Sequence, residues 1–234
     1  MWLPIAAFGA ELAATITGFG AATLFLPFAL LALPAREAVV VTALFHFVGN
    51  LAKGGIFRRT INWRLALTFG IPSVVATAVG AWFLGDLSTA VLRRLIGAVL
   101  ILASIIEWRA ESLRLPARAT TAAVAGAVAG GLAGLTGVGG ALRGVVLLTF
   151  QLPREVYIGT GAAIAIMTDL SRNATYLLRS TADVQPRVLI PVLIAAVVGT
   201  LLGRKLLQRI TVGAWRTVVL LALLGFGIYY LDPA

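Results

Sequence analysis

Polar side chains with acid–base or ligand-binding chemistry stand inside the most apolar stretches of this chain. The stretch TALFHFVGNLAKGG places His46, Asn50 and Lys53 at i, i+4 and i+7, on one face of a helix. In a lipid bilayer such groups must face the protein interior or water, so we expect them to line a pathway, with His46 and Asn50 reaching a substrate. The alternatives are a hydrogen-bonded core position for His46 and a snorkelling Lys53 near the helix end. Histidine titrates near neutral pH, so His46 is also a candidate proton carrier.

A second polar group lies in the stretch GAAIAIMTDLSRNATYLLRS. There Asp169 can reach Arg172 and Asn173 at i+3 and i+4. We expect these three side chains to line the pathway, or Asp169 and Arg172 to form a structural pair. Glu11 stands alone in the apolar N-terminal segment. A carboxylate removed from water can load and release protons, so Glu11 is our first candidate for proton coupling, against a structural pairing with an arginine.

The stretch AGGLAGLTGVGGALRGVVLL, residues 129–148, combines many glycines with Arg143. A glycine inside a helix costs about 1 kcal/mol relative to alanine, and an arginine at bilayer depth costs at least ~2.5 kcal/mol. For Gly126, Gly130 and Gly131 we expect close helix packing. For Arg143, which has no acid nearby in the sequence, we expect contact with a ligand or pathway. The rival is an ion pair with Asp169 or Glu11.

The composition identifies the class of protein. The chain of 234 residues is 60% hydrophobic and 12% charged, whereas soluble domains carry about 25% charged residues. The apolar runs lack a period of two, which predicts membrane helices rather than a barrel. The net charge of +10 lies mostly in short connections, where orientation signals belong, and does not indicate a nucleic-acid partner. Without cysteine and with one histidine, we expect no metal site, no cofactor and no enzyme activity.

The chain resembles itself at an offset of 118 or 119 residues. The matching pairs are Thr17-Gly18-Phe19-Gly20 with Thr136-Gly137-Val138-Gly139, and Leu33-Pro34-Ala35-Arg36-Glu37 with Leu152-Pro153-Arg154-Glu155. This pattern predicts two diverged membrane repeats, residues 1–112 and 117–234, joined by the charged stretch EWRAESLRLPARA in one membrane domain. Each repeat has four apolar segments, at 2–33, 37–57, 63–84 and 88–108, and at 118–152, 155–179, 186–204 and 212–231.

The first segment of each repeat is too long for one membrane span and too short for two. Each is therefore either a broken spanning helix or a re-entrant hairpin, whose arms of ~14 residues would be only ~21 Å long. Re-entrant hairpins gather most of the loop cations on one face, which is then cytoplasmic. That face holds Arg58, Arg59, Arg64, Arg109, Arg114, Arg118, Arg154, Arg204, Lys205, Arg209 and Arg216.

These features predict an all-α integral membrane protein of two inverted repeats, each a Gly-rich broken or re-entrant first segment followed by three transmembrane helices. Such architecture is typical of transporters. Since no Walker-type loop is present, a gradient would supply the energy. The hairpin tips would meet near mid-membrane, where helix N-termini attract anions. The predicted binding residues are Thr17, Gly18, Phe19, Gly20, His46, Asn50, Thr136, Gly137, Val138, Gly139, Gly140 and Arg143; Glu11, Lys53, Asp169, Arg172 and Asn173 are predicted for coupling or the pathway.

Two Gly-rich first segments, each followed by a Leu-Pro connection and a Thr-containing second helix, resemble the TauE/SafE sulfite exporter family over essentially the whole chain. The resemblance implies a multi-pass protein of a bacterial-type inner membrane that exports a small sulfur oxyanion such as sulfite or sulfoacetate. The first tip departs from the richest family pattern, because Ala21 and Ala22 follow Gly20. A selective anion channel or uniporter of the same fold is the alternative. The expected partners are the anion, the lipid bilayer and protons, with homo-oligomerisation left open.

Overall fold

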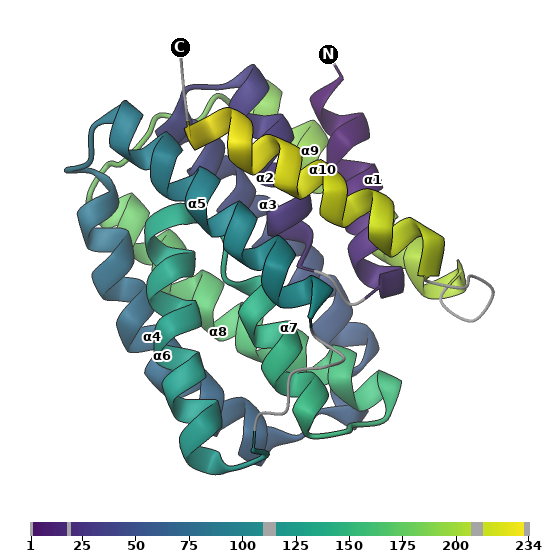
Figure 1. The fold of residues 1–234 in the computed structure, drawn as a ribbon. Coiled ribbons are helices and arrows are strands. Elements are labelled where there is room, and N and C mark those ends of the chain that lie inside the picture. The colour runs from purple at the N-terminus through teal and green to yellow at the C-terminus, as the bar shows by residue number, and fades with distance from the viewer. Residues whose placement is uncertain (1, 18–19, 110–115, 207–212, 232–234) are drawn as a thin grey trace.

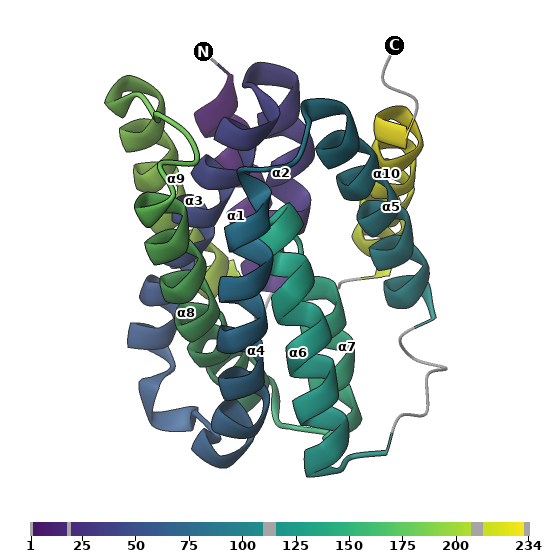
Figure 2. The same ribbon diagram turned by 90° about the vertical axis from the view of Figure 1, so that its left-hand side faces the viewer.

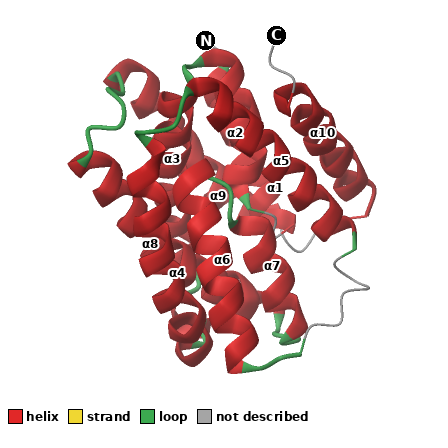
Figure 3. Ribbon diagram, turned by 60° about the vertical axis from the view of Figure 1, so that its left-hand side comes forward, coloured by secondary structure: helices red, strands yellow, loops and turns green. Residues whose placement is uncertain are grey.

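The computed structural model describes residues 2–17, 20–109, 116–206 and 213–231, and this part of the chain is helical without a strand (Figure 3). The elements are α1 (Leu3–Thr17), α2 (Ala21–Ala32), α3 (Ala35–Ile56), η1 (Arg58–Thr60), α4 (Trp63–Leu84), α5 (Thr89–Trp108), α6 (Ala119–Thr136), α7 (Gly140–Thr149), α8 (Arg154–Leu178), α9 (Pro186–Leu206) and α10 (Gly213–Leu231). The all-helical prediction is confirmed, and the helix limits follow the predicted apolar segments within a few residues.

Both Gly-rich first segments are broken near the middle. The first is interrupted between α1 and α2, and the second between α6 and α7. The second break has a clear local cause, because Gly137 has a φ of +80° and its N–H bonds to Ala133 O at 3.0 Å. This left-handed position ends a helix readily only at glycine.

The two broken segments run in opposite directions. α1 descends from the end of the molecule marked N, and α2 returns to that end (Figures 1 and 2). α6 rises from the other end, and α7 returns there (Figure 2). The arms are unequal, because α6 has 18 residues and α7 has 10. α6 is thus longer than the ~14-residue arm we expected, about 27 Å at 1.5 Å per residue.

Five helices in the described part are long and apolar enough to cross a membrane, namely α3, α4, α5, α6 and α9. Four of them are among the six predicted spans, and the fifth, α6, is the first part of the second Gly-rich segment. α8 is longer still but holds Asp169 and Arg172 along its length. Large apolar side chains on the outside of α4, including Ile71, Val75 and Val79, are more than half exposed. A surface of this kind suits lipid, so the chain is a multi-pass membrane protein.

The helices of the two halves interlock. α4 packs mainly on α6, α1 on α9, α5 on α10 and α3 on α8, while α8 also contacts α4 and α9 contacts α3. Each of these pairings has its counterpart when α1–α5 are exchanged with α6–α10. The first arm of each hairpin is therefore held by a helix of the other half.

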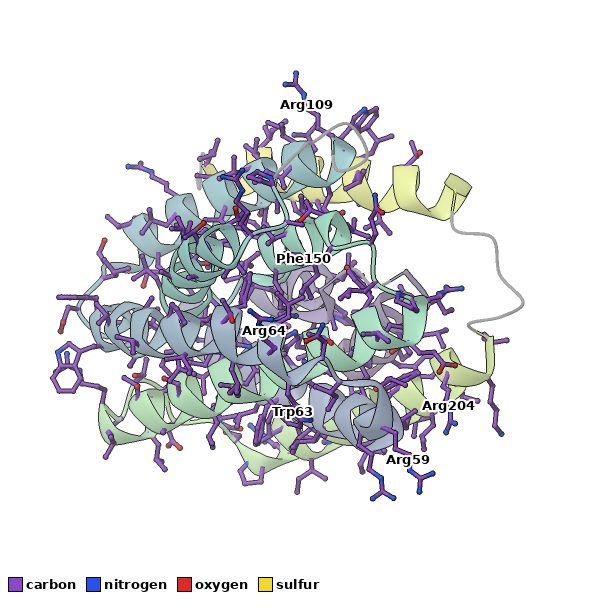
Figure 4. The ribbon with its side chains drawn as sticks, turned by 90° about the horizontal axis from the view of Figure 1, so that it is seen from below. Arg59, Trp63, Arg64, Arg109, Phe150 and Arg204 are labelled. Atoms are coloured by element: carbon purple, nitrogen blue, oxygen red, sulfur yellow. The ribbon has the colours of Figure 1, made fainter. Side chains whose placement is uncertain are left out.

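One end of the molecule is basic. Figure 4 views this end and labels Arg59, Arg64, Arg109 and Arg204, beside Trp63 and Phe150. The remaining described cations of the predicted face also stand at or near helix ends: Arg58, Arg118, Arg154 and Lys205. Arg114, Arg209 and the side chain of Arg216 lie outside what the structure describes.

Candidate functional site

The two hairpin tips meet inside the molecule. Gly20 caps the start of α2, and Gly140 is the first residue of α7. A Cβ on Gly20 would lie 3.0 Å from the Cα of Gly140, and a Cβ on Gly140 would lie 3.0 Å from the Cα of Gly20. The two backbones are thus in direct contact, with no room for side chains between them. The N-termini of two return arms, each carrying partial positive charge, come together here.

A small cavity lies beside this contact, between the first tip, α3, α7 and α8. Its volume is about 40 Å³, counted as space open to the centre of a water molecule. That is room for a few waters or a small oxyanion. Six of the predicted residues line it: Gly20, His46, Asn50, Lys53, Gly140 and Arg143. The cavity, called the tip cavity below, is therefore lined by three of the predicted cationic or titratable side chains, His46, Lys53 and Arg143, from α3 and α7.

Arg143 is the cation of the tip cavity that has no protein partner among the described residues. Its side chain is partly exposed into the cavity, one turn into α7. Among the described residues no ion pair joins Arg143 to Asp169 or Glu11, whose carboxylates are bound to Arg172 and to Lys53. A guanidinium at this depth retains hydrogen-bond donors that can bind an anion.

Asp169, Arg172 and His46 form a buried network. Arg172 Nη2 lies 2.7 Å from Asp169 Oδ1, and His46 Nδ1 lies 2.7 Å from Asp169 Oδ2. Arg172 also donates from Nη1 to the carbonyl of Gly137 at 3.1 Å and to that of Ala133 at 3.4 Å. These carbonyls end α6, where a cation is favoured. The structural pairing of Asp169 with Arg172 is confirmed, and Arg172 holds the second tip from outside the tip cavity.

Glu11 forms the second buried ion pair. Its Oε1 lies 2.6 Å from Lys53 Nζ and accepts a hydrogen bond from Thr200 Oγ1 at 2.9 Å. The snorkelling alternative for Lys53 is wrong, because the residue is only 7% exposed. The structural partner of Glu11 is a lysine and not the arginine weighed from the sequence. This pair joins α1 to α3 and α9 while Lys53 also lines the tip cavity.

The other predicted residues are mostly engaged with backbone. Asn50 lines the tip cavity and donates to His46 O at 2.7 Å, whereas Asn173 lies away from it and donates to Ala43 O at 3.4 Å. The Thr136 hydroxyl donates to Leu132 O at 2.8 Å. Gly137, Val138 and Gly139 shape the second tip without lining the tip cavity. Gly18, Phe19 and the side chain of Thr17 lie outside the described residues.

Two residues near the tip cavity were missed from the sequence, Tyr157 and Glu107. A Cβ on Gly144 would lie 3.1 Å from Tyr157 Oη and 3.4 Å from Glu107 Oε1, so all three meet at one wall. Tyr157 lines the tip cavity, and Glu107 is 8% exposed. The available signal was an acid in the last turn of an apolar segment, which the adjoining charged linker obscured.

A wider hollow of about 770 Å³ opens at the basic end, between the end of α3, η1, the start of α8 and the end of α9. Its charged walls are Arg58, Arg59, Arg204 and Glu155, and it is called the basic vestibule below. Vestibule and tip cavity both lie along the second half of α3. Excess positive charge in a concave surface raises the local concentration of anions.

The bundle, its lipid-compatible surface and the buried cations define an all-helical, multi-pass membrane protein. The family model of the sulfite exporter TauE/SafE matches residues 3–230, so the chain belongs to the TauE/SafE sulfite exporter family, a family of membrane transporters. A search of curated proteins returns no match to the chain.

Proposed function

We propose that this protein is a secondary transporter that exports a small sulfur-containing oxyanion, such as sulfite or a sulfonate, across a bacterial-type inner membrane. The observation that carries the proposal is Arg143, a cation without a protein partner among the described residues, in a cavity between two hairpin tips. An uncompensated charge at low dielectric is stabilised strongly by a bound counter-ion. The substrate would supply that counter-ion.

The chemistry of the tip cavity suits an oxyanion. A planar guanidinium can donate two parallel hydrogen bonds to two oxygens of one sulfonate or sulfite group. The first N–H groups of α7, next to Gly140, lack partners within their own helix and carry partial positive charge. Lys53 and Asn50 supply further donors from α3.

The interlocked packing supports transport by alternating access. We propose that residues 1–112 and 117–234 are inverted repeats, because exchanging the halves reproduces the observed helix pairings and the hairpins run in opposite directions. Rocking one half-derived bundle on the other would expose the tip contact to each side in turn. The basic face, by the positive-inside rule, would be cytoplasmic.

The decisive test is flux of sulfite and sulfoacetate in proteoliposomes, with sulfate for comparison, using wild type and Arg143→Met. Loss of the charged partner should weaken anion affinity roughly 100-fold. Arg187→Met is the matched control, since Arg187 is exposed at the opposite end and bonds to Gln185. Wild-type affinity in Arg143→Met would remove this site assignment. Selective flux without saturation would indicate the channel instead.

A further inference from the structure

The Glu11 site is built around a single carboxylate. Glu11 is fully buried, and its Oε2 makes no hydrogen bond to any described residue, although Oε1 has two donors. Glycines on two helices make the room: a Cβ on Gly49 would lie 2.7 Å from the Glu11 carboxyl carbon, and one on Gly199 would lie 3.0 Å from its Cβ. The carboxylate therefore occupies space that glycines on both neighbouring helices keep open.

Lys53 belongs to two sites at once. It pairs with Glu11 at 2.6 Å, and it lines the tip cavity together with Arg143. Lysine carries its charge on a flexible stem with freely rotating donors, so a short rotation can redirect the ammonium from one acceptor to another. An anion in the tip cavity competes with Glu11 for this ammonium.

The charges around the tip cavity decide the outcome of this competition. Lys53 is paired with Glu11 and Arg172 with Asp169, whereas Arg143 forms no ion pair with a described residue. A monoanion balances Arg143 alone. A dianion requires Lys53 as well, and Glu11 is then left buried without a counter-charge. Burial of an isolated carboxylate is strongly unfavourable, so its neutral form takes over.

Resting on the proposed function, we infer that the site takes up dianions together with one proton. The second charge of the dianion draws the Lys53 ammonium into the tip cavity, and a proton from the aqueous side binds a Glu11 carboxylate oxygen. No covalent bond forms apart from that O–H bond. Dianion, proton and Arg143 then sum to zero charge. A monoanion enters without a proton.

In the part of the chain that the structure describes, the helices packed around Glu11 offer few other ionisable groups for this proton. α1 and α2 hold no further ionisable residue. α3 presents Lys53, with His46 beyond it at the tip cavity, and α9 presents Thr200, with Arg204 and Lys205 at its basic end. His46 is already bonded to Asp169.

The experiment measures proton uptake by the purified protein in weakly buffered detergent at neutral pH, with two probes. Sulfoacetate carries a carboxylate and a sulfonate and is dianionic there, whereas methanesulfonate is a monoanion. We expect about one proton taken up per bound sulfoacetate and none per methanesulfonate. Because binding consumes a proton, the Kd for sulfoacetate should rise about tenfold per unit increase in pH, while that for methanesulfonate stays constant.

Variants identify the group that takes the proton. Glu11→Gln should abolish the uptake and bind sulfoacetate several-fold more tightly at neutral pH, because Lys53 is no longer held. Asp86→Asn removes an exposed carboxylate that pairs with Arg179 and should leave the uptake unchanged. The wild-type dependence of Kd on pH remains decisive if a variant fails to fold.

Three results overturn the inference while leaving the proposed function intact: sulfoacetate binding without proton uptake, equal uptake with both probes, or uptake that persists in Glu11→Gln. A wild-type protein that binds neither sulfoacetate nor sulfite overturns the proposed function, and the inference with it.

Discussion

The first arms of the two hairpins use equivalent positions in opposite ways. The offset of 119 residues that relates the tips makes three residues of α1 equivalent to three of α6. In each helix the three residues are one turn apart. The pairs are Ala7 with Gly126, Glu11 with Gly130, and Thr15 with Gly134. One half thus carries side chains, including a charge, where the other half has only backbone.

In the second half these three positions are the glycines of α6, and they bring the backbones of α6 and α4 together. A Cβ on Gly126 would lie 2.2 Å from Phe69 O, one on Gly130 2.3 Å from Ser73 O, and one on Gly134 2.2 Å from Thr77 O. α4 therefore lies directly on α6, and Thr77 Oγ1 adds a hydrogen bond to Gly130 O at 2.9 Å. Such small-residue contacts fix membrane helices rigidly.

In the first half the glycines lie on the neighbouring helices instead. Gly49 of α3 and Gly199 of α9 face Glu11, and a Cβ on Gly203 would lie 2.7 Å from the Cβ of Thr15. The position that the α4 backbone occupies beside α6 in the second half is therefore occupied in the first half by the ion pair of Glu11 and Lys53. The difference indicates that the α6 arm is a rigid support, whereas the α1 arm holds a buried ion pair, which we propose responds to the substrate.

Breaking the backbone contact should give the largest effect. In Gly130→Ala the new methyl group would overlap Ser73 O, so we expect destabilisation of about 3 kcal/mol or more, measured by unfolding in detergent. Gly131→Ala is the matched control, because its Cβ would lie 3.9 Å from the nearest atom, Ala76 O. It should be neutral or stabilising by up to ~1 kcal/mol. Equal stability of both variants would contradict the rigid-support interpretation.

Removing the arginine that holds the second tip ranks next. Arg172→Met leaves Asp169 buried without its cation and frees the carbonyls of Gly137 and Ala133. Breaking a buried pair costs about 3–5 kcal/mol, so the unfolding midpoint should fall sharply. Arg172→Met with Asp169→Asn should recover part of this loss. A double variant no more stable than the single one would show that the tip contacts, and not the ion pair, dominate.

We expect the smallest effects at Thr200 of α9, which bonds to Glu11, and at Thr77 of α4, which bonds to Gly130. Thr200→Val removes a hydrogen bond to a carboxylate and should destabilise by ~1.5–3 kcal/mol, whereas Thr77→Val removes one to a neutral carbonyl and should cost ~0.5–1.5 kcal/mol. Thr200→Val should also change the pH dependence of sulfoacetate binding, because the hydroxyl stabilises charged Glu11. If Thr77→Val changed that dependence equally, the two halves would not differ as described.

Several features of the fold and site were open to prediction because they depend on local sequence. The lengths of the hydrophobic runs predicted where the helices lie, and α4 spans Trp63–Leu84 as predicted. Glycine at Gly20 and Gly137 marked the breaks, because a left-handed or closely approached backbone excludes most side chains. Asp169 and Arg172 could be paired because a helix places i and i+3 side by side.

Partners that are distant in sequence could not be predicted. Lys53 near a helix end is equally compatible with the membrane surface until α1 places Glu11 beside it. Glu107 adjoins a charged linker and gains its buried setting from Gly144 and Tyr157 of other helices. Such contacts follow from how helices pack, which periodicity does not encode.

The sequence by itself determined a helical membrane protein with two broken segments, because the lipid bilayer demands long apolar helices and glycine alone tolerates the breaks. Only the tertiary structure decided which buried charges are neutralised. Opposite charges attract over a few ångströms, so their pairing depends on the packing of α1, α3, α8 and α9. That packing compensated Lys53 and Arg172 and left Arg143 without a partner among the described residues, which is the basis of the proposed anion site.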